Sequence, residues 1–268
     1  MSILSHISQL VKDPPPGYVF ELSEAGVAFA REAGTGFVPF EPGTLVVSPV
    51  EDNILKADAA AAQLRTIAPF DGAKKRDGSK KRRRAALILP DYAARVNVLD
   101  FDSFPSSTEQ QLSLIRFRLK KTLPFDIESA AVSYYAQPAP KGHKIQVVAV
   151  IVALEIIARY EALSRALNFQ PGEGTTSSLA ALNLYSPEPG AGVAVIAKLG
   201  GKVLTVMVLE GGILKLFRCV ALEEATEEEV LAVLHPTFSY VEDELAAPVT
   251  RLILCGFPAD VLPHLQHD

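Results

Sequence analysis

Apolar and polar residues alternate along the chain in runs that predict both strands and helices. Short alternating runs between turn residues are typical of strands, and apolar residues three or four positions apart are typical of helices. The pattern predicts strands at 18–20, 26–31, within 34–50, at 85–89, 95–101, 130–137 and 144–154, three within 193–221, and one at 249–255. It predicts helices at 53–68, 108–123, 155–168, 176–185, 223–244 with a break at Pro236, and 258–265. This order defines an α/β protein.

The chain divides into two halves that echo each other. FELSEAGVAFA (20–30) and IAKLGGKVLTVMV (196–208) both read as strand–turn–strand openings of a sheet. A break at Gln170–Gly174 predicts a first half over 1–170, with a core at 15–90 and an inserted subdomain at 91–168, and a second half over 171–268. Ligands usually bind in clefts between such units.

A basic stretch follows the first predicted helix. Residues 74–84 hold eight basic side chains and one acidic one, a net charge of +7, which leaves −12 on the rest of the chain. The basic residues are Lys74, Lys75, Arg76, Lys80, Lys81, Arg82, Arg83 and Arg84. We interpret the stretch as a solvated loop, with attraction to an anionic membrane surface as the alternative.

Composition excludes several functional classes. A net charge of −5 and the lack of aromatics in the basic stretch argue against nucleic-acid binding. No run approaches the roughly 20 apolar residues of a membrane span, and MSILSHISQLVKDPPPG lacks the features of a secretory signal. Cys219 and Cys255 are expected to be two buried thiols, and the five scattered histidines show no metal-ligand spacing, so no metal is expected.

Three segments carry a resemblance to a known family. They are LILPDYAARVNVLDFDSFPSSTEQQLSLIRFRLKKTLPFDIESAAVSYY (87–135), KIQVVAVIVALEIIARYEALSRALNFQPGEGTTSSLAALNLY (144–185) and LILCGFPADVLPHL (252–265). In order and pattern they resemble PilM-type proteins of type IV pilus assembly. These belong to the actin-like superfamily, with FtsA and the cytoplasmic domain of GspL as relatives.

The resemblance covers about residues 15–265 and implies a fold. That fold is an actin-like (ribonuclease H-like) two-domain α/β fold with a small inserted α+β subdomain. Only residues 221–248 separate the second hairpin and its third strand from the last strand. The outer subdomain of the second half is therefore expected to be much reduced.

The nucleotide motifs of the superfamily are damaged here. Its members hold MgATP with two Asp-Gly hairpins and a glycine-rich adenosine turn. The corresponding positions are Glu21, Ser23 and Ala28 in the first hairpin, Ala197, Leu199, Gly200, Gly201 and Lys202 in the second, and Gly256 and Phe257 in the turn. Lys198 or Lys202 remains a candidate phosphate contact, but Gly200-Gly201 reads better as a hairpin turn.

Three damaged motifs favour a pseudo-ATPase with no catalytic residues and no cofactor. The alternative is an active actin-like ATPase with ATP and Mg²⁺, for which Glu21 is the one well-placed carboxylate. Phe257 is expected to intrude where the base enters such a site.

The resemblance also implies a partner. In the family, a groove between the core and the inserted subdomain receives the cytoplasmic tail of a PilN-like inner-membrane protein as an extended segment. The candidate groove residues are Leu112, Ile115, Arg116, Leu119 and Phe125. The alternative is that the leucines and isoleucine are core positions at helical spacing. The expected location is cytoplasmic and peripheral to the inner membrane, with self-association left open.

Overall fold

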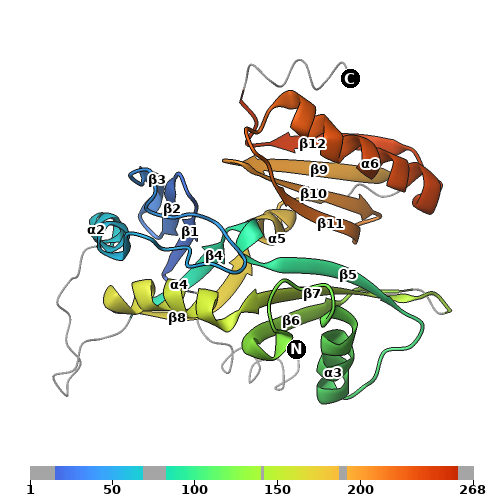
Figure 1. The fold of residues 1–268 in the computed structure, drawn as a ribbon, viewed down its shortest axis with the longest axis horizontal. Coiled ribbons are helices and arrows are strands. Elements are labelled where there is room, and N and C mark those ends of the chain that lie inside the picture. The colour runs from blue at the N-terminus through green and yellow to red at the C-terminus, as the bar shows by residue number, and fades with distance from the viewer. Residues whose placement is uncertain (1–15, 69–82, 140–141, 187–191, 259–268) are drawn as a thin grey trace, which may run out of the picture.

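The computed structural model describes residues 16–68, 83–139, 142–186 and 192–258. Within them the chain forms three sheets of five, four and three strands (Figure 1). The sheets correspond to the first half, the second half and the inserted subdomain. The predicted helix at 258–265 and basic residues 74–82 fall outside this part of the chain, except for Pro258.

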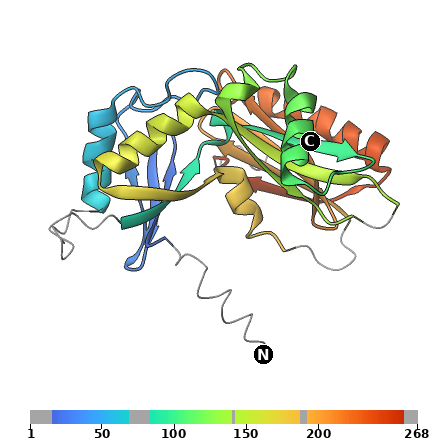
Figure 2. The same cartoon turned by 90° about the horizontal axis from the view of Figure 1, so that it is seen from below.

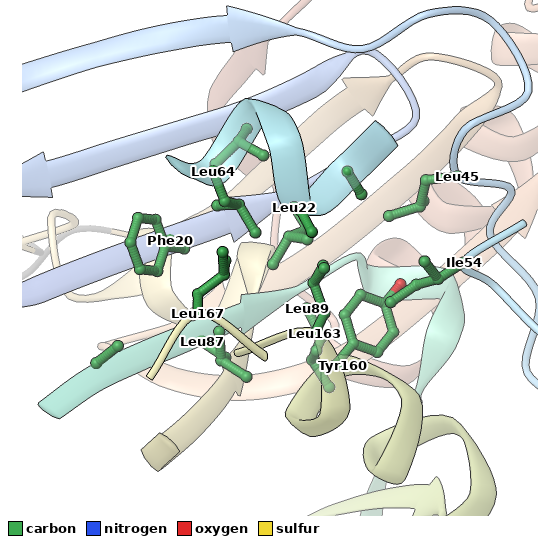
Figure 3. Packing of buried hydrophobic residues seen from close by; sticks show 14 of the residues in the cluster. Phe20, Leu22, Leu45, Ile54, Leu64, Leu87, Leu89, Tyr160, Leu163 and Leu167 are labelled. Atoms are coloured by element: carbon green, nitrogen blue, oxygen red, sulfur yellow. The ribbon is translucent and has the colours of Figure 1, made fainter. Parts of the chain in front are cut away.

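The first half is a five-stranded sheet with two helices on one face. Its strands are β1 (Tyr18–Leu22), β2 (Gly26–Arg31), β3 (Gly34–Pro39), β4 (Arg83–Leu89) and β8 (Phe169–Thr176), in the order β3-β2-β1-β4-β8. Helices α2 (Ala57–Ile67) and α4 (Leu154–Ala166) cover the face on which Phe20, Leu22, Leu87 and Leu89 are buried (Figures 2 and 3). These side chains alternate along β1 and β4, as a strand with one buried face requires.

The inserted subdomain is a three-stranded antiparallel sheet with one helix. Its strands are β5 (Arg95–Phe101), β6 (Ala130–Ala136) and β7 (Ile145–Ala153), in the order β5-β7-β6, and its helix is α3 (Thr108–Leu119). Two short 3-10 turns precede its strands: η1 (Asp91–Ala93) comes before β5, and η2 (Ile127–Ser129) comes before β6. One face packs on α3 through Ile115, Leu119, Val147, Ala149 and Ile151.

The second half repeats the first in reduced form. Its strands are β9 (Val193–Gly200), β10 (Val203–Glu210), β11 (Ile213–Ala221) and β12 (Val249–Cys255), in the order β11-β10-β9-β12. In both halves an antiparallel three-strand meander is extended by a parallel strand beside its first strand. This topology confirms the predicted echo. Only α6 (Glu227–Leu245) joins β11 to β12, consistent with a much reduced outer subdomain.

The inserted sheet lies against the second half. Helix α6 covers one face of β9–β12, and the other face packs on the inserted sheet through Val148, Met207, Leu209, Leu214 and Phe217. Gln137, at the end of β6, accepts from the Leu214 N–H and donates to its carbonyl, both at 2.8 Å. The insert therefore binds the two halves to each other.

Three predicted boundaries are corrected by the structure. The segment Gln170–Gly174 is not a break, because it lies in β8, which pairs with β4 and completes the first sheet. Helix α4 was assigned to the insert but packs in the core of the first half through Ile156, Tyr160 and Leu163. Helix α6 continues through Pro236 without ending there.

Arg83 and Arg84 were also placed wrongly, since both lie in β4 and not in a loop. The Arg83 guanidinium lies 4.3 Å from the ring centroid of Phe169 and 5.3 Å from that of Tyr18. A guanidinium over aromatic faces at these distances gains cation–π attraction. Arg83 is therefore part of the packing of the first sheet.

Candidate functional site

A cleft lies where the β1–β2 turn of the first half faces the β9–β10 turn of the second. It encloses a cavity of about 280 Å³. Its charged lining residues are Glu21, Glu24, Asp91 and Lys198. The two turns approach each other closely, because a Cβ added to Gly201 would lie 3.6 Å from Glu24 Oε2.

Asp91 lies at the centre of the polar contacts between the halves. It follows β4 in η1, and its side chain is only 4% exposed. Its Oδ1 accepts from the Ser178 N–H at 2.7 Å, and its Oδ2 accepts from Ser178 Oγ at 2.6 Å and from Thr205 Oγ1 at 3.1 Å. These donors satisfy a carboxylate that would otherwise be costly to bury.

Lys198 reaches from β9 into the same cluster. Its Nζ lies 3.5 Å from Asp91 Oδ2 and donates to Ser177 Oγ at 2.6 Å. The Ser177 hydroxyl in turn donates to Glu21 Oε1 on β1. Side chains from both halves thus form one continuous network, which consists of Glu21, Asp91, Ser177, Ser178, Lys198 and Thr205.

The predicted nucleotide positions of the first half do gather at the cleft. Glu21, Ser23 and Ala28 all line the cavity, as do Leu199, Gly200 and Gly201 of the second half. The Ser23 hydroxyl donates to the Gly26 carbonyl at 3.0 Å, so it stabilises its own turn. Gly201, with φ of +62°, and Lys202 form the two residues between paired Gly200 and Val203.

The remaining predicted positions point elsewhere. Ala197 is buried in the core under α6, and Phe257 packs in that same core. Phe257 is therefore a core residue of the second half and does not intrude on the expected path of a base. Gly256 has φ of +75°, and a Cβ there would lie 2.2 Å from the Leu199 carbonyl oxygen, so the close passage of the chain requires glycine. Lys202 pairs with Glu224 at 3.7 Å on the surface.

Sequence reasoning missed Asp91 as a site residue. Its position directly after β4, at the carboxyl end of a parallel strand, was the available signal, because ligand-facing residues gather there in α/β sheets. Ser177, Ser178 and Thr205 had no such signal, since only the fold brings them to Asp91.

A second hollow, of about 280 Å³, lies between the first sheet and the inserted subdomain. We call it the β6–β8 groove. Three parts of the chain line it. The first sheet contributes Leu87, Leu89, Thr175 and Thr176, and the insert contributes Ala131, Ser133, Val150 and Val152. Helix α4 adds Ile157, Tyr160 and Glu161.

Two polar side chains beside the β6–β8 groove are buried. The Thr176 Oγ1 has no hydrogen-bond partner among the described residues. The Tyr160 hydroxyl accepts from Asn53 Nδ2 at 3.2 Å, and burial raises the pKa of Tyr160 above its ordinary value.

The groove predicted on the 108–123 helix is not formed by Ile115 and Leu119. Ile115 is fully buried and Leu119 is 2% exposed, because both pack in the core of the inserted subdomain. Arg116 donates to the carbonyls of Ile127 and Ala130 and so ties α3 to η2. Phe125 packs against that core and Leu112 is half-buried. The core interpretation therefore holds for Ile115 and Leu119.

The described ranges hold no group of three or more His, Cys, Asp or Glu side chains placed to bind a metal ion. None of their helices is long and apolar enough to span a membrane.

The fold is that of the actin-like ATPases. A Bacteroides thetaiotaomicron protein with an actin-like ATPase fold and unknown function matches with a TM-score of 0.51 at 14% identity, over 93% of this chain and 86% of that one. No protein-family model matches the chain, and no curated protein matches it in sequence.

Two further structures with this fold come from a pilus biogenesis complex and from a secretion system. The PilM–PilN type IV pilus biogenesis complex matches with a TM-score of 0.63 at 14% identity, over 95% of this chain and 75% of that one. The cytoplasmic domain of EpsL, an inner-membrane component of the Vibrio cholerae type II secretion system, matches at 0.50 and 15%, over 93% and 92%. At identities this low, these structural matches establish the shared fold alone.

The two cysteines should differ in reactivity. Burial raises the pKa of Cys219 to about 12, and its sulfur lies 3.4 Å from Thr205 Oγ1, whereas Cys255 is exposed, contrary to the expectation of two buried thiols. Because the thiolate is the reactive form, Ellman's reagent at pH 8 should modify one thiol per chain rapidly and two in guanidinium. Cys255→Ser should remove the rapid phase. Two rapid thiols in the native protein would contradict this assignment.

Proposed function

We propose that this protein is a cytoplasmic scaffold of a type IV pilus or related secretion machine. It lies at the inner membrane, binds the cytoplasmic tail of a PilN-like membrane protein and hydrolyses no ATP. The shared fold with the PilM–PilN complex and with the EpsL cytoplasmic domain supports this class of machine. The β6–β8 groove is the observation on which the proposal rests.

The β6–β8 groove suits an extended apolar segment. Strands β6 and β8 are the outermost strands of their sheets, so each has one edge unpaired by any other described strand. Unpaired strand edges accept extended peptides through backbone hydrogen bonds, with specificity from side-chain pockets. The unpaired edges of β6 and β8 and the apolar walls from Leu87, Leu89 and Val152 provide both kinds of contact.

A single substitution in the groove should block the partner. Ala131 lines the groove from β6, and Ala131→Glu would place a carboxylate among apolar side chains, which costs on the order of 2 kcal/mol or more. We expect the synthetic cytoplasmic tail of a PilN-type protein to bind the native chain and to lose tenfold or more in affinity to this variant, measured by fluorescence anisotropy.

The matched control is Phe117→Glu. Phe117 is 78% exposed on α3, outside the groove, so the same charge there should leave the affinity unchanged. Circular dichroism would establish that both variants fold. Unchanged affinity of Ala131→Glu would refute the groove, and loss of affinity in Phe117→Glu alone would move the site to α3.

The cleft supports the second part of the proposal, that no ATP is hydrolysed. Its lining holds three carboxylates, Glu21, Glu24 and Asp91, against one ammonium, Lys198. That ammonium already pairs with Asp91 and donates to Ser177, so it is not free to offset phosphate charge. A cavity of about 280 Å³ is also at the lower limit of small-molecule sites.

Calorimetry tests the nucleotide question directly. Titration with ATP and Mg²⁺ should give no binding heat up to millimolar nucleotide, and a thermal-shift assay should show no stabilisation, because a ligand that binds the native state raises its stability. Micromolar binding that Glu21→Ala removes would instead establish the alternative, an active actin-like ATP-binding protein.

We also propose that the basic segment 74–82 attracts the protein to anionic membranes. It holds six basic residues and one acidic residue, and each Lys or Arg near such a surface contributes roughly 1 kcal/mol. The native protein should sediment with phosphatidylserine vesicles at low salt, and Glu at Lys74, Lys75, Lys80 and Lys81 should abolish this. Unchanged sedimentation of that variant would eliminate the membrane role.

A further inference from the structure

The hydrogen-bond network in the cleft joins the halves through one residue of the second half in particular. Lys198 lies on β9, yet its ammonium contacts Asp91 and Ser177 of the segments that end the first sheet. Thr205 on β10 adds a bond to Asp91 from the same side. The contacts therefore cross from one half to the other at the base of the cavity.

We propose that Lys198 is a built-in cation that takes the place of a diffusible ligand and latches the two halves together. In this arrangement the closed cleft is the resting state of the chain and needs no bound molecule. The latch consists of Lys198, Asp91, Ser177 and Glu21. The proposal concerns the cleft itself and does not depend on a partner in the β6–β8 groove.

The burial of Asp91 gives the latch its strength. A buried carboxylate that loses its cation is left as an uncompensated charge, and such losses are among the more destabilising single changes. Lys198 is itself only 24% exposed, so solvent screens the pair weakly. The Ser177 hydroxyl extends the effect by accepting from Lys198 and donating to Glu21.

A neighbouring lysine provides the contrast. Lys202 lies in the turn of the same hairpin and pairs with Glu224 at 3.7 Å, but the two side chains are 57% and 77% exposed. Exposed pairs of this kind contribute little to stability. Both lysines thus have a carboxylate partner, and burial at the boundary between the halves distinguishes Lys198.

Cys219 offers a reporter for opening of the latch. It lies on β11, where the second-half sheet packs on the inserted sheet, and its sulfur lies 3.4 Å from Thr205 Oγ1, whose hydroxyl donates to Asp91. Cys219 is only partly exposed, so separation of the halves would expose this thiol further. In a Cys255→Ser background, an increase in the labelling rate of Cys219 over the parent rate in native buffer reports separation of the halves.

Lys198→Met, which keeps the apolar stem and removes the ammonium, should raise this rate roughly tenfold or more. Lys202→Met is the matched control and should label at the parent rate. The double variant of Lys198→Met with Asp91→Asn should label no faster than Lys198→Met, because partners in one interaction are not additive. Circular dichroism would verify that each variant is folded.

The outcomes separate clearly. Labelling of folded Lys198→Met at the parent rate would overturn the latch, as would equal increases in both lysine variants. If Lys198→Met does not fold, Lys198→Gln decides, since it removes the charge and keeps a hydrogen-bonding group. Faster labelling of Lys198→Gln would support the latch, and the parent rate would overturn it.

Discussion

A carboxylate buried between two halves of a protein must be satisfied from both, and Asp91 imposes this constraint here. Its oxygens accept from Ser178 after the first sheet and from Thr205 in the second, and Lys198 supplies the charge. Each of these residues lies on a different element, so the network forms only when η1, α5 (Ser177–Leu182), β9 and β10 are all in place. Misplacing any of them takes a hydrogen-bond donor or the charge partner away from the buried carboxylate, which is destabilising.

The inserted subdomain reinforces the same arrangement by packing. In β7, Val147, Ala149 and Ile151 face α3, whereas Val148 faces the second half. Alternate residues of one strand therefore serve two cores, as the pleat of a strand allows. The backbone of Leu214 is paired with the Gln137 amide, so even the end of β6 is bonded to the second half. Polar contacts in the cleft and apolar contacts under the insert thus bind the halves along two separate surfaces.

The sequence could predict the strands and helices better than it could predict which of them pack together. Both hairpins and the strands at 95–101 and 249–255 follow from local periodicity, and the structure confirms them. Strand β8 was missed because Pro171, Gly172 and Gly174 are typical of turns, yet an edge strand with a register shift tolerates them. The spacing of Ile115 and Leu119 indicated an apolar face correctly but gave no means of deciding whether a core or a ligand covers it. The network around Asp91 is non-local, so no short-range pattern encodes it.

The cleft and the β6–β8 groove are joined by consecutive residues. Thr175 and Thr176 end strand β8 and line the groove, and Ser177 and Ser178 follow directly and bind Lys198, Glu21 and Asp91. A strand end cannot shift by much while the next two residues keep hydrogen bonds of 2.6 to 2.7 Å to the other elements. The same network that fixes the halves therefore also fixes one wall of the groove. Under the proposed function, the extended segment would dock on a preformed surface, which lowers the entropy cost of docking. A scaffold gains from such rigidity, whereas a nucleotide-driven switch requires a cleft that is free to change.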